Sequence, residues 1–361
     1  MIISISDAVT QTWVVIGALV VLLLISIRKK PKEFFPKSTT DELKGLAILL
    51  VVLSHIGYFL VNDHRFLLPL SNYAGVGVDL FLLLSGYGLT MSALQKPLSR
   101  LQFYKKRLIR LYIPVAVIII FFLILDALIL KRTYPLVLSI KNFLGFFPSA
   151  DLYNDIDSPL WFITLLLSYY VIFPLIFWRR APLVSAGIIG YVSWWLANKN
   201  LSDLLPVTHG IASLYQLHLL TFPIGVAIAA VVFHTLQRNM ETKWKNLVRT
   251  WILVGLTVFL LHMLSRSAVG GDWKQEEIVS IATALAFMSV FILNSFEFGL
   301  LSFFGKYSFE IYLIHWPLLY RYDLVYSHLP AGIATLSYLL LFIFLGYWYQ
   351  KIIARLLVIS K

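Results

Sequence analysis

The sequence predicts an all-α protein, a polytopic bundle of transmembrane helices. Hydrophobic residues make up 59% of the 361 residues, charged residues make up 13%, and the mean hydropathy is +0.82. The apolar runs last about twenty residues, which is the length of a helix that crosses a bilayer. They are apolar all round, whereas barrel strands alternate over about ten residues. The polar stretches between them are too short to bury a core, so no soluble domain is expected.

Eleven apolar runs are expected to span the membrane. The first is followed by Arg28, Lys29 and Lys30 and lacks a small-residue cleavage site, so we expect a retained helix and not a signal peptide. The expected spans are residues 11–27, 44–62, 73–93, 111–130, 159–178, 183–198, 209–233, 248–265, 278–294, 301–320 and 331–350.

The basic residues predict the orientation of these spans. Placing the N-terminus outside puts 22 of the 30 lysines and arginines at cytoplasmic helix ends and loops. We therefore expect a protein of the cell membrane with its N-terminus outside and its C-terminus in the cytoplasm. The net charge of +12 then reflects topology and contact with anionic membrane lipid, and no nucleic-acid partner is expected. The expected external loops 149–158 and 270–277 combine acidic and aromatic residues, as expected of a surface that meets a glycan or another polar acceptor.

Several kinds of site are excluded by residue type. The chain has no cysteine, which rules out disulfides, thiol catalysis and cysteine-ligated zinc. It also has no phosphate loop, GxSxG elbow, HExxH motif or metal-ligand spacing, so no metal is expected.

In the second span, Lys44 opens the apolar run and His55 lies eleven residues further on. At about 1.5 Å per residue the two are about 16 Å apart on nearly the same helix face. This distance is roughly half of a hydrocarbon core of about 30 Å. Because ionisable groups at such a depth are costly, His55 is a candidate functional residue.

The third span contains "GVGVDLFLLLSGYGLT", in which Asp79 lies about two residues inside an apolar helix. An unpaired carboxylate there would be costly. The glycines around it allow a close approach either to neighbouring helices or to a ligand. Packing alone and a cavity around Asp79 both stay open.

The fourth span begins after the basic loop "RLQFYKKRLIRLYIP". Arg107 and Arg110 are three residues apart and share a helix face. Two guanidiniums placed in this way can clamp a phosphate group. The alternative is that these residues only mark a cytoplasmic helix end.

Trp161 stands at the outer end of the fifth span. We expect it to belong to an aromatic belt at the membrane interface, and the alternative is that it forms the floor of an acceptor site. The intramembrane polar residues Asp126, His218 and His262 stand alone in their spans and are expected to be packing groups.

The tenth span contains "FFGKYSFEIYLIHWPLL", with Glu310, Tyr312 and His315. Glu310 is expected at a depth similar to that of His55, where a carboxylate could orient the imidazole ring. An ordinary ion pair with Lys306, one turn earlier, is the alternative. His315 lies near the outer side, where interfacial anchoring is also open.

Taken together, these motifs resemble the acyltransferase family 3 membrane proteins. The resemblance rests on Lys44-x10-His55, "GVGVDLFLLLSGYGL", Arg107-x-x-Arg110, "LWFI" at 160–163 and "FFGKYSFEIYLIHWP". It implies a ten-helix acyltransferase bundle over residues 40–361, preceded by one extra transmembrane helix and a basic linker in residues 1–39. It also implies transfer of an acyl group, usually acetyl, from cytoplasmic acyl-CoA to hydroxyls of extracytoplasmic or lipid-linked glycans.

The resemblance assigns roles to individual residues. His55 is implied as the catalytic histidine, and Asp79 matches the acidic position of the family's glycine-rich turn. Glu310 is a second candidate carboxylate because of its expected depth. Lys44, Arg107 and Arg110 are implied to bind acyl-CoA, most simply acetyl-CoA. Trp161, Tyr312 and His315 are the candidates for substrate binding.

The chain also departs from the family pattern. It reads "WFITLLLSYY" where many members carry a "WSLSVEEQFY"-like stretch, so any role of that glutamate has no residue to perform it here. We expect the chain to belong to the shorter branch of the family, without the C-terminal SGNH domain that is frequent in it. Transfer to the final acceptor is therefore expected within the bundle or through a glycan-assembly partner protein.

Two other functions stay open at this point. One is a transporter or flippase for a glycan or lipid-linked sugar, which an internal inverted repeat would favour. The other is an acyltransferase for succinyl or longer acyl groups.

Overall fold

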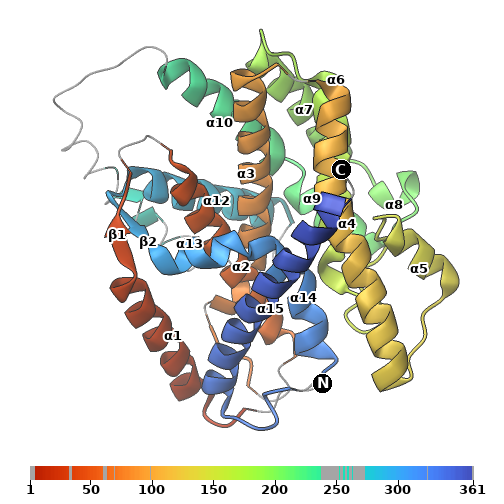
Figure 1. The fold of residues 1–361 in the computed structure, drawn as a ribbon. Helices are drawn as coiled ribbons and strands as arrows, with labels where there is room; N and C mark the ends of the chain where they lie inside the picture. Colours follow the sequence, from red (N-terminus) through yellow and green to blue (C-terminus); the bar gives the residue numbers. More distant parts are fainter. Residues whose placement is uncertain are drawn as a thin grey trace. The chain divides into compact units, whose positions relative to one another are not determined.

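The computed structural model describes residues 5–31, 35–59, 63–68, 70–97, 99–236, 273–322 and 324–359, and six positions between 252 and 262. Helices dominate the described residues, as Figure 1 shows, which confirms the all-α class. The helices are α1 (Ala8–Ile25), α2 (Lys37–Gly57), α3 (Ala74–Gln95), α4 (Arg100–Leu125), α5 (Leu136–Phe143), α6 (Trp161–Ile176), α7 (Pro182–Ala197), α8 (Leu201–Leu204), α9 (His209–His218), α10 (Thr221–Leu236), α12 (Trp273–Leu293), α13 (Gly299–Lys306), α14 (Ser308–Tyr320) and α15 (Ala331–Ile359).

Seven of the described helical segments are long and apolar enough to cross a membrane, which makes this a multi-pass membrane protein. They are Ala8–Ile25, Ala74–Gln95, Arg100–Leu130, Ser158–Ile176, His209–His234, Gln275–Leu293 and Ala331–Leu357. The expected span 183–198 appears as the shorter apolar helix α7. The expected span 248–265 lies almost wholly outside the described residues.

Two expected spans differ in detail from the prediction. The helix that contains His55 begins at Lys37, so the prediction that Lys44 opens it is wrong. Its first two turns are polar, and for that reason hydropathy alone placed the start too late. The tenth expected span is interrupted at Tyr307, which separates α13 from α14.

The chain divides into two compact units, which are described separately. The first unit comprises residues 1–81 and 241–352, and the second comprises residues 82–240 and 353–361. The division falls inside α3 and α15.

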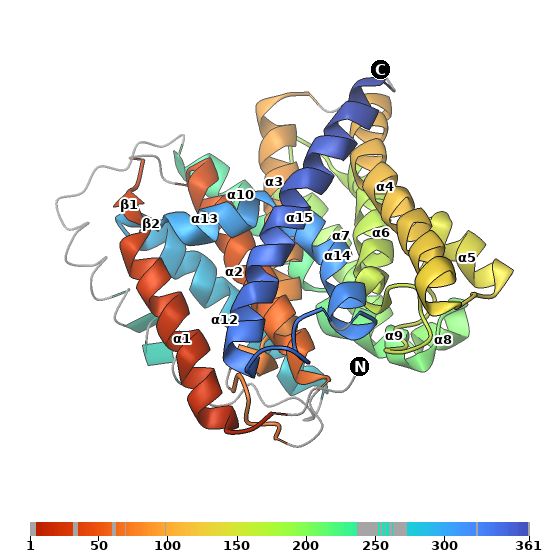
Figure 2. The same cartoon turned by 60° about the horizontal axis from the view of Figure 1, so that its bottom comes forward.

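In the first unit, α2 is the central helix and packs against α12, α13 and α14. It lies side by side with α13 in both views (Figures 1 and 2). Gly45 and Gly305 make this contact possible, since a Cβ at Gly45 would lie 1.9 Å from the Leu301 carbonyl oxygen and one at Gly305 would lie 1.7 Å from that of Asp41. Only the absence of side chains allows the backbones to approach so closely.

The N-terminal segment is joined to the rest of the first unit by several contacts. Strand β1 (Ile27–Lys29) pairs antiparallel with β2 (Phe296–Phe298), just before α13. The Lys30 ammonium donates to the Phe291 carbonyl at the end of α12. In α1, the Thr12 hydroxyl accepts a hydrogen bond from the Leu67 amide at 2.8 Å, and Gln11 accepts one from the Gly332 amide at 2.9 Å.

In the second unit, α6 packs against α4 and α7, and α7 packs against α9 and α10. Gly86 and Gly225 allow the later half of α3 to lie close to α10, because a Cβ at Gly86 would lie 2.3 Å from the Phe222 carbonyl oxygen. Two arginines bind the carbonyls that α6 and α3 leave unpaired at their ends. Arg100 donates to Pro174 at 3.1 Å, and Arg179 donates to Leu94 at 2.8 Å.

Candidate active site

The candidate active site is built on a pair of histidines in the first unit. His55, in the last turn of α2, lies with its Nδ1 2.7 Å from Nε2 of His315 on α14. The two rings are within 8° of parallel and their centroids are 5.0 Å apart. His315 is fully buried, and His55 is partly buried. The two residues are 260 positions apart in the chain, and the packing of α14 against α2 brings them together.

The second ring nitrogen of His315 faces backbone carbonyls of its own helix. Its Nδ1 lies 2.9 Å from the Tyr312 oxygen and 3.1 Å from the Ile311 oxygen. A carbonyl only accepts, so this nitrogen must hold the proton and donate. In a neutral His315 ring, Nε2 is then the acceptor, and the hydrogen bond between the rings is donated by Nδ1 of His55.

This hydrogen-bond chain determines the chemistry that His55 can perform. With the proton of the neutral ring on Nδ1, the lone pair lies on Nε2, which can accept a proton or attack a carbonyl. Both rings cannot be cationic, because two donors would then face each other across 2.7 Å. The pair therefore holds at most one positive charge.

Aromatic side chains surround His55. The edge-on ring of Trp316 lies 4.9 Å from the imidazole, and the Tyr58 ring lies at 5.6 Å, measured between centroids. Phe59 in turn lies 5.0 Å from Trp316. Such a wall excludes water from one side of the imidazole while the partly exposed ring remains accessible.

The carboxylates expected beside His55 have other hydrogen-bond partners. Asp79 is buried and accepts a hydrogen bond from the Ser280 hydroxyl of α12. Glu310 accepts one from the Gln350 amide of α15 at 3.2 Å. In the described part of the chain, the hydrogen-bond partner of His55 is His315 and not a carboxylate.

The alternative roles considered for this helix are not observed. Glu310 and Lys306 form no ion pair among the described residues, because the break at Tyr307 ends the helix between them; the Lys306 ammonium lies over the Tyr307 ring instead. His315 is fully buried and so is no interfacial anchor. Tyr312 is buried too, and its backbone carbonyl holds the Nδ1 proton of His315.

The candidate phosphate-binding residues lie on α4 in the second unit. Arg107 is half-buried near Tyr170 of α6, and Arg110 is exposed. Neither guanidinium forms an ion pair with any residue that the structure describes. Arg100 and Arg179, by contrast, bind backbone carbonyls and are structural. Lys44 lies in the first unit, 3.7 Å from the Asp41 carboxylate.

Trp161 is a buried residue of the second unit and not part of an exposed belt. Its ring stacks on His218 with 5.8 Å between centroids and lies 6.0 Å from that of Tyr215. Sequence reasoning missed Tyr215, because a tyrosine in an apolar helix is common. It also missed Ser280 and Gln350, because the sequence does not show that these polar side chains donate hydrogen bonds to Asp79 and Glu310.

Within the described ranges, no group of three or more histidine, aspartate or glutamate side chains could hold a metal ion.

The acyltransferase 3 family model, described as an acyltransferase domain, matches residues 40–350. Neither the curated proteins nor the solved structures gave a match to the chain.

Proposed function

Given that the chain belongs to acyltransferase family 3, we propose that this membrane acyltransferase moves an acyl group from acyl-CoA to a hydroxyl of a glycan. Acetyl-CoA is the expected donor. The acceptor is an extracytoplasmic or lipid-linked glycan, with a glycan-assembly protein as the partner that presents it. The basic residues at alternate helix ends support an N-terminus outside and a C-terminus in the cytoplasm of a cell membrane.

The hydrogen bond between His55 and His315 is the observation that supports this proposal most directly. Nε2 of His55 removes the proton from the acceptor hydroxyl as its oxygen attacks the thioester carbonyl. The carbon–sulfur bond breaks, the ester forms, and the CoA thiolate takes the proton back from Nε2. A direct attack of Nε2 on the thioester, with an acyl-histidine intermediate, uses the same lone pair.

His315 supports the charge that develops in this step. Once Nε2 of His55 has gained a proton, the ring is an imidazolium whose Nδ1–H still donates to Nε2 of His315. A hydrogen bond with a charged partner is stronger than a neutral one, so the pair stabilises the transition state more than the ground state. This is the role that an aspartate plays in a triad.

Arg107 and Arg110 are proposed to hold the phosphates of CoA, because their guanidiniums have no ion-pair partner among the described residues. Lys44 would add a further cation on the donor side. Replacing both arginines by glutamine should weaken acetyl-CoA binding at least tenfold in calorimetric titration. Lys105→Gln, on the same helix and exposed, is the matched control and should change binding less than twofold. An unchanged affinity in the double variant would mean that the arginines only mark a cytoplasmic helix end, and it would favour a transporter.

Catalysis by His55 is tested with His55→Ala in proteoliposomes that contain labelled acetyl-CoA and a glycan acceptor. Removing a general base costs a factor of about 10² to 10⁴ in rate. We expect transfer to fall by at least 10² while acetyl-CoA binding persists. His209→Ala removes an exposed histidine and should leave the rate unchanged. Undiminished transfer by His55→Ala would remove His55 from the mechanism.

A further inference from the structure

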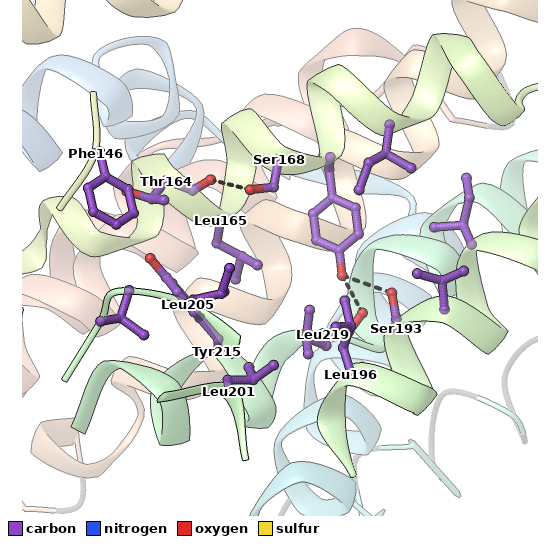
Figure 3. A pocket seen from close by; sticks show the side chains of 15 residues that line it. Phe146, Thr164, Leu165, Ser168, Ser193, Leu196, Leu201, Leu205, Tyr215 and Leu219 are labelled. Carbon is purple, nitrogen blue, oxygen red and sulfur yellow. Dashed lines mark hydrogen bonds between the residues drawn. The ribbon is translucent and has the colours of Figure 1, made fainter. Parts of the chain in front are cut away.

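The second unit contains an apolar cavity that the proposed reaction does not use. Its volume is about 240 Å³, and α6, α7, α8 and α9 line it (Figure 3). Most of its wall is leucine, isoleucine, valine and phenylalanine. An apolar cavity of about 150 Å³ already holds benzene and stays free of water. This cavity therefore has room for a longer stretch of hydrocarbon.

Most hydroxyl groups around the cavity are occupied by hydrogen bonds within the protein. Tyr169 donates to the Leu219 carbonyl at 2.5 Å. Ser168 donates to the Thr164 carbonyl at 2.9 Å, and Thr164 donates to Gly145 at 3.3 Å. These groups are satisfied without a ligand.

Tyr215 is the exception among the lining hydroxyls. Its oxygen is buried and makes no hydrogen bond of ordinary geometry with any described residue. It is turned toward Thr164 (Figure 3), whose proton is already donated to Gly145. A buried hydroxyl without a full partner is energetically unfavourable. It is therefore ready to bind a polar atom at one end of an apolar ligand.

The two faces of α7 indicate where such a ligand comes from. Ile189 and Ser193 are buried and line the cavity. Val184 and Tyr191, on the opposite face, are 53% and 64% exposed, as expected of a helix that meets lipid on that side. A hydrocarbon chain in the bilayer thus lies one helix away from the cavity.

The loop next to the cavity favours a sugar over a phosphate as the polar end. The Thr208 amide donates to the Pro148 carbonyl at 2.9 Å and thereby ties the cavity wall to the loop 149–158. In this loop Asp151 and Asp155 build a rigid turn. Carboxylates accept hydrogen bonds from sugar hydroxyls and repel the phosphate of an anionic phospholipid.

We infer that this cavity binds the hydrocarbon chain of a glycolipid, with the Tyr215 hydroxyl on the first polar atom and the sugar at the loop 149–158. The inference deepens the proposed function and rests on it in one respect, since it identifies the acceptor as a lipid-linked sugar. The chain would hold the acceptor in the membrane while its hydroxyl reacts.

The test uses the full-length protein in phosphatidylcholine nanodiscs and a glucosyl diacylglycerol with a photoreactive diazirine in one acyl chain. Illumination should label peptides of α6, α7 and α9, and unlabelled glucosyl diacylglycerol should compete. Val192→Trp, which points a large ring into the cavity, should reduce labelling at least tenfold. Val184→Trp, the same substitution on the opposite, exposed face of the helix, should stay within twofold of the wild type.

A second variant keeps the test decisive if Val192→Trp does not fold. Tyr215→Phe removes a hydroxyl that makes no hydrogen bond of ordinary geometry with any described residue, and it should weaken labelling three- to tenfold without lowering Tm. Equal labelling by a phosphatidylglycerol probe with the same diazirine chain, or no response to either variant, would overturn the inference. The assay needs no acyl-CoA. Labelling without any acyl transfer would therefore reject the proposed function and leave the cavity assignment standing.

Discussion

The role of His315 is best tested by removing the acceptor that faces His55. In His315→Leu the Nδ1–H of His55 loses its partner at 2.7 Å. An unpaired buried donor costs about 1–3 kcal/mol, and that cost is avoided when the proton moves to Nε2. The lone pair then lies on the wrong nitrogen. A preference of 1–3 kcal/mol corresponds to a factor of about 5 to 150 in the population of the reactive tautomer.

We therefore expect kcat to fall roughly 5- to 150-fold in His315→Leu, with the KM for acetyl-CoA changed less than twofold. His315→Gln is the matched variant, because its side-chain oxygen can accept from His55 near the position of the lost Nε2. Its kcat should stay within about fivefold of the wild type. Initial rates in proteoliposomes measure both constants, and the ¹⁵N shifts of labelled histidine report the tautomer directly.

Tm separates this effect from a loss of packing. If the leucine and glutamine variants lose the same activity at wild-type Tm, the acceptor at this position has no role. If His315→Leu retains full kcat, the pair is not part of the mechanism.

Three further predictions follow from other parts of the structure. The CoA dependence of initial rates should show a KM raised at least tenfold when Arg107 and Arg110 are both glutamine, with kcat changed much less, because the clamp binds donor phosphates in ground and transition states alike. Gly305→Ala should lower the free energy of unfolding by about 1–3 kcal/mol and reduce Tm, because its Cβ would overlap the α2 backbone. Gly88→Ala is the control, since a Cβ at Gly88 would have no neighbouring atom within 4 Å. Equal Tm values for the two variants would contradict the described packing of α13 against α2. Asp151 has a pKa below its usual range, because its carboxylate accepts hydrogen bonds from the Asn154 side chain and from the Tyr153 and Asn154 amides. The order of the loop 149–158 should therefore persist down to about pH 4 and decrease as pH falls through the lowered pKa. Amide exchange measures this order, and a loop unchanged at pH 2 would refute the prediction.

The sequence was sufficient to predict the fold class and most spans, because a bilayer allows few solutions to a chain this apolar. Ends and interruptions were harder to predict. Hydropathy identifies apolar runs and therefore reports neither the polar first turns of α2 nor the break at Tyr307 after α13.

For the site, depth and family resemblance were sufficient to identify His55 as a candidate. They did not predict its hydrogen-bond partner, because a carboxylate is the residue that most often orients a catalytic histidine and Glu310 lies on the tenth span. The two residues considered, Glu310 and His315, are five positions apart on one helix. Which of them faces α2 depends on how α14 is rotated, and a span that is apolar all round gives no periodic signal for that rotation.

The attachment of α1 has a practical consequence. The family match begins at residue 40, yet β1 pairs with β2, and Gln11 and Thr12 bond to backbone amides elsewhere in the first unit. A protein shortened to the matched residues would leave the β2 edge and several backbone donors without partners. The family match therefore begins at residue 40, whereas the part of the chain that folds together begins earlier. The first helix is a structural component of the unit that contains both histidines.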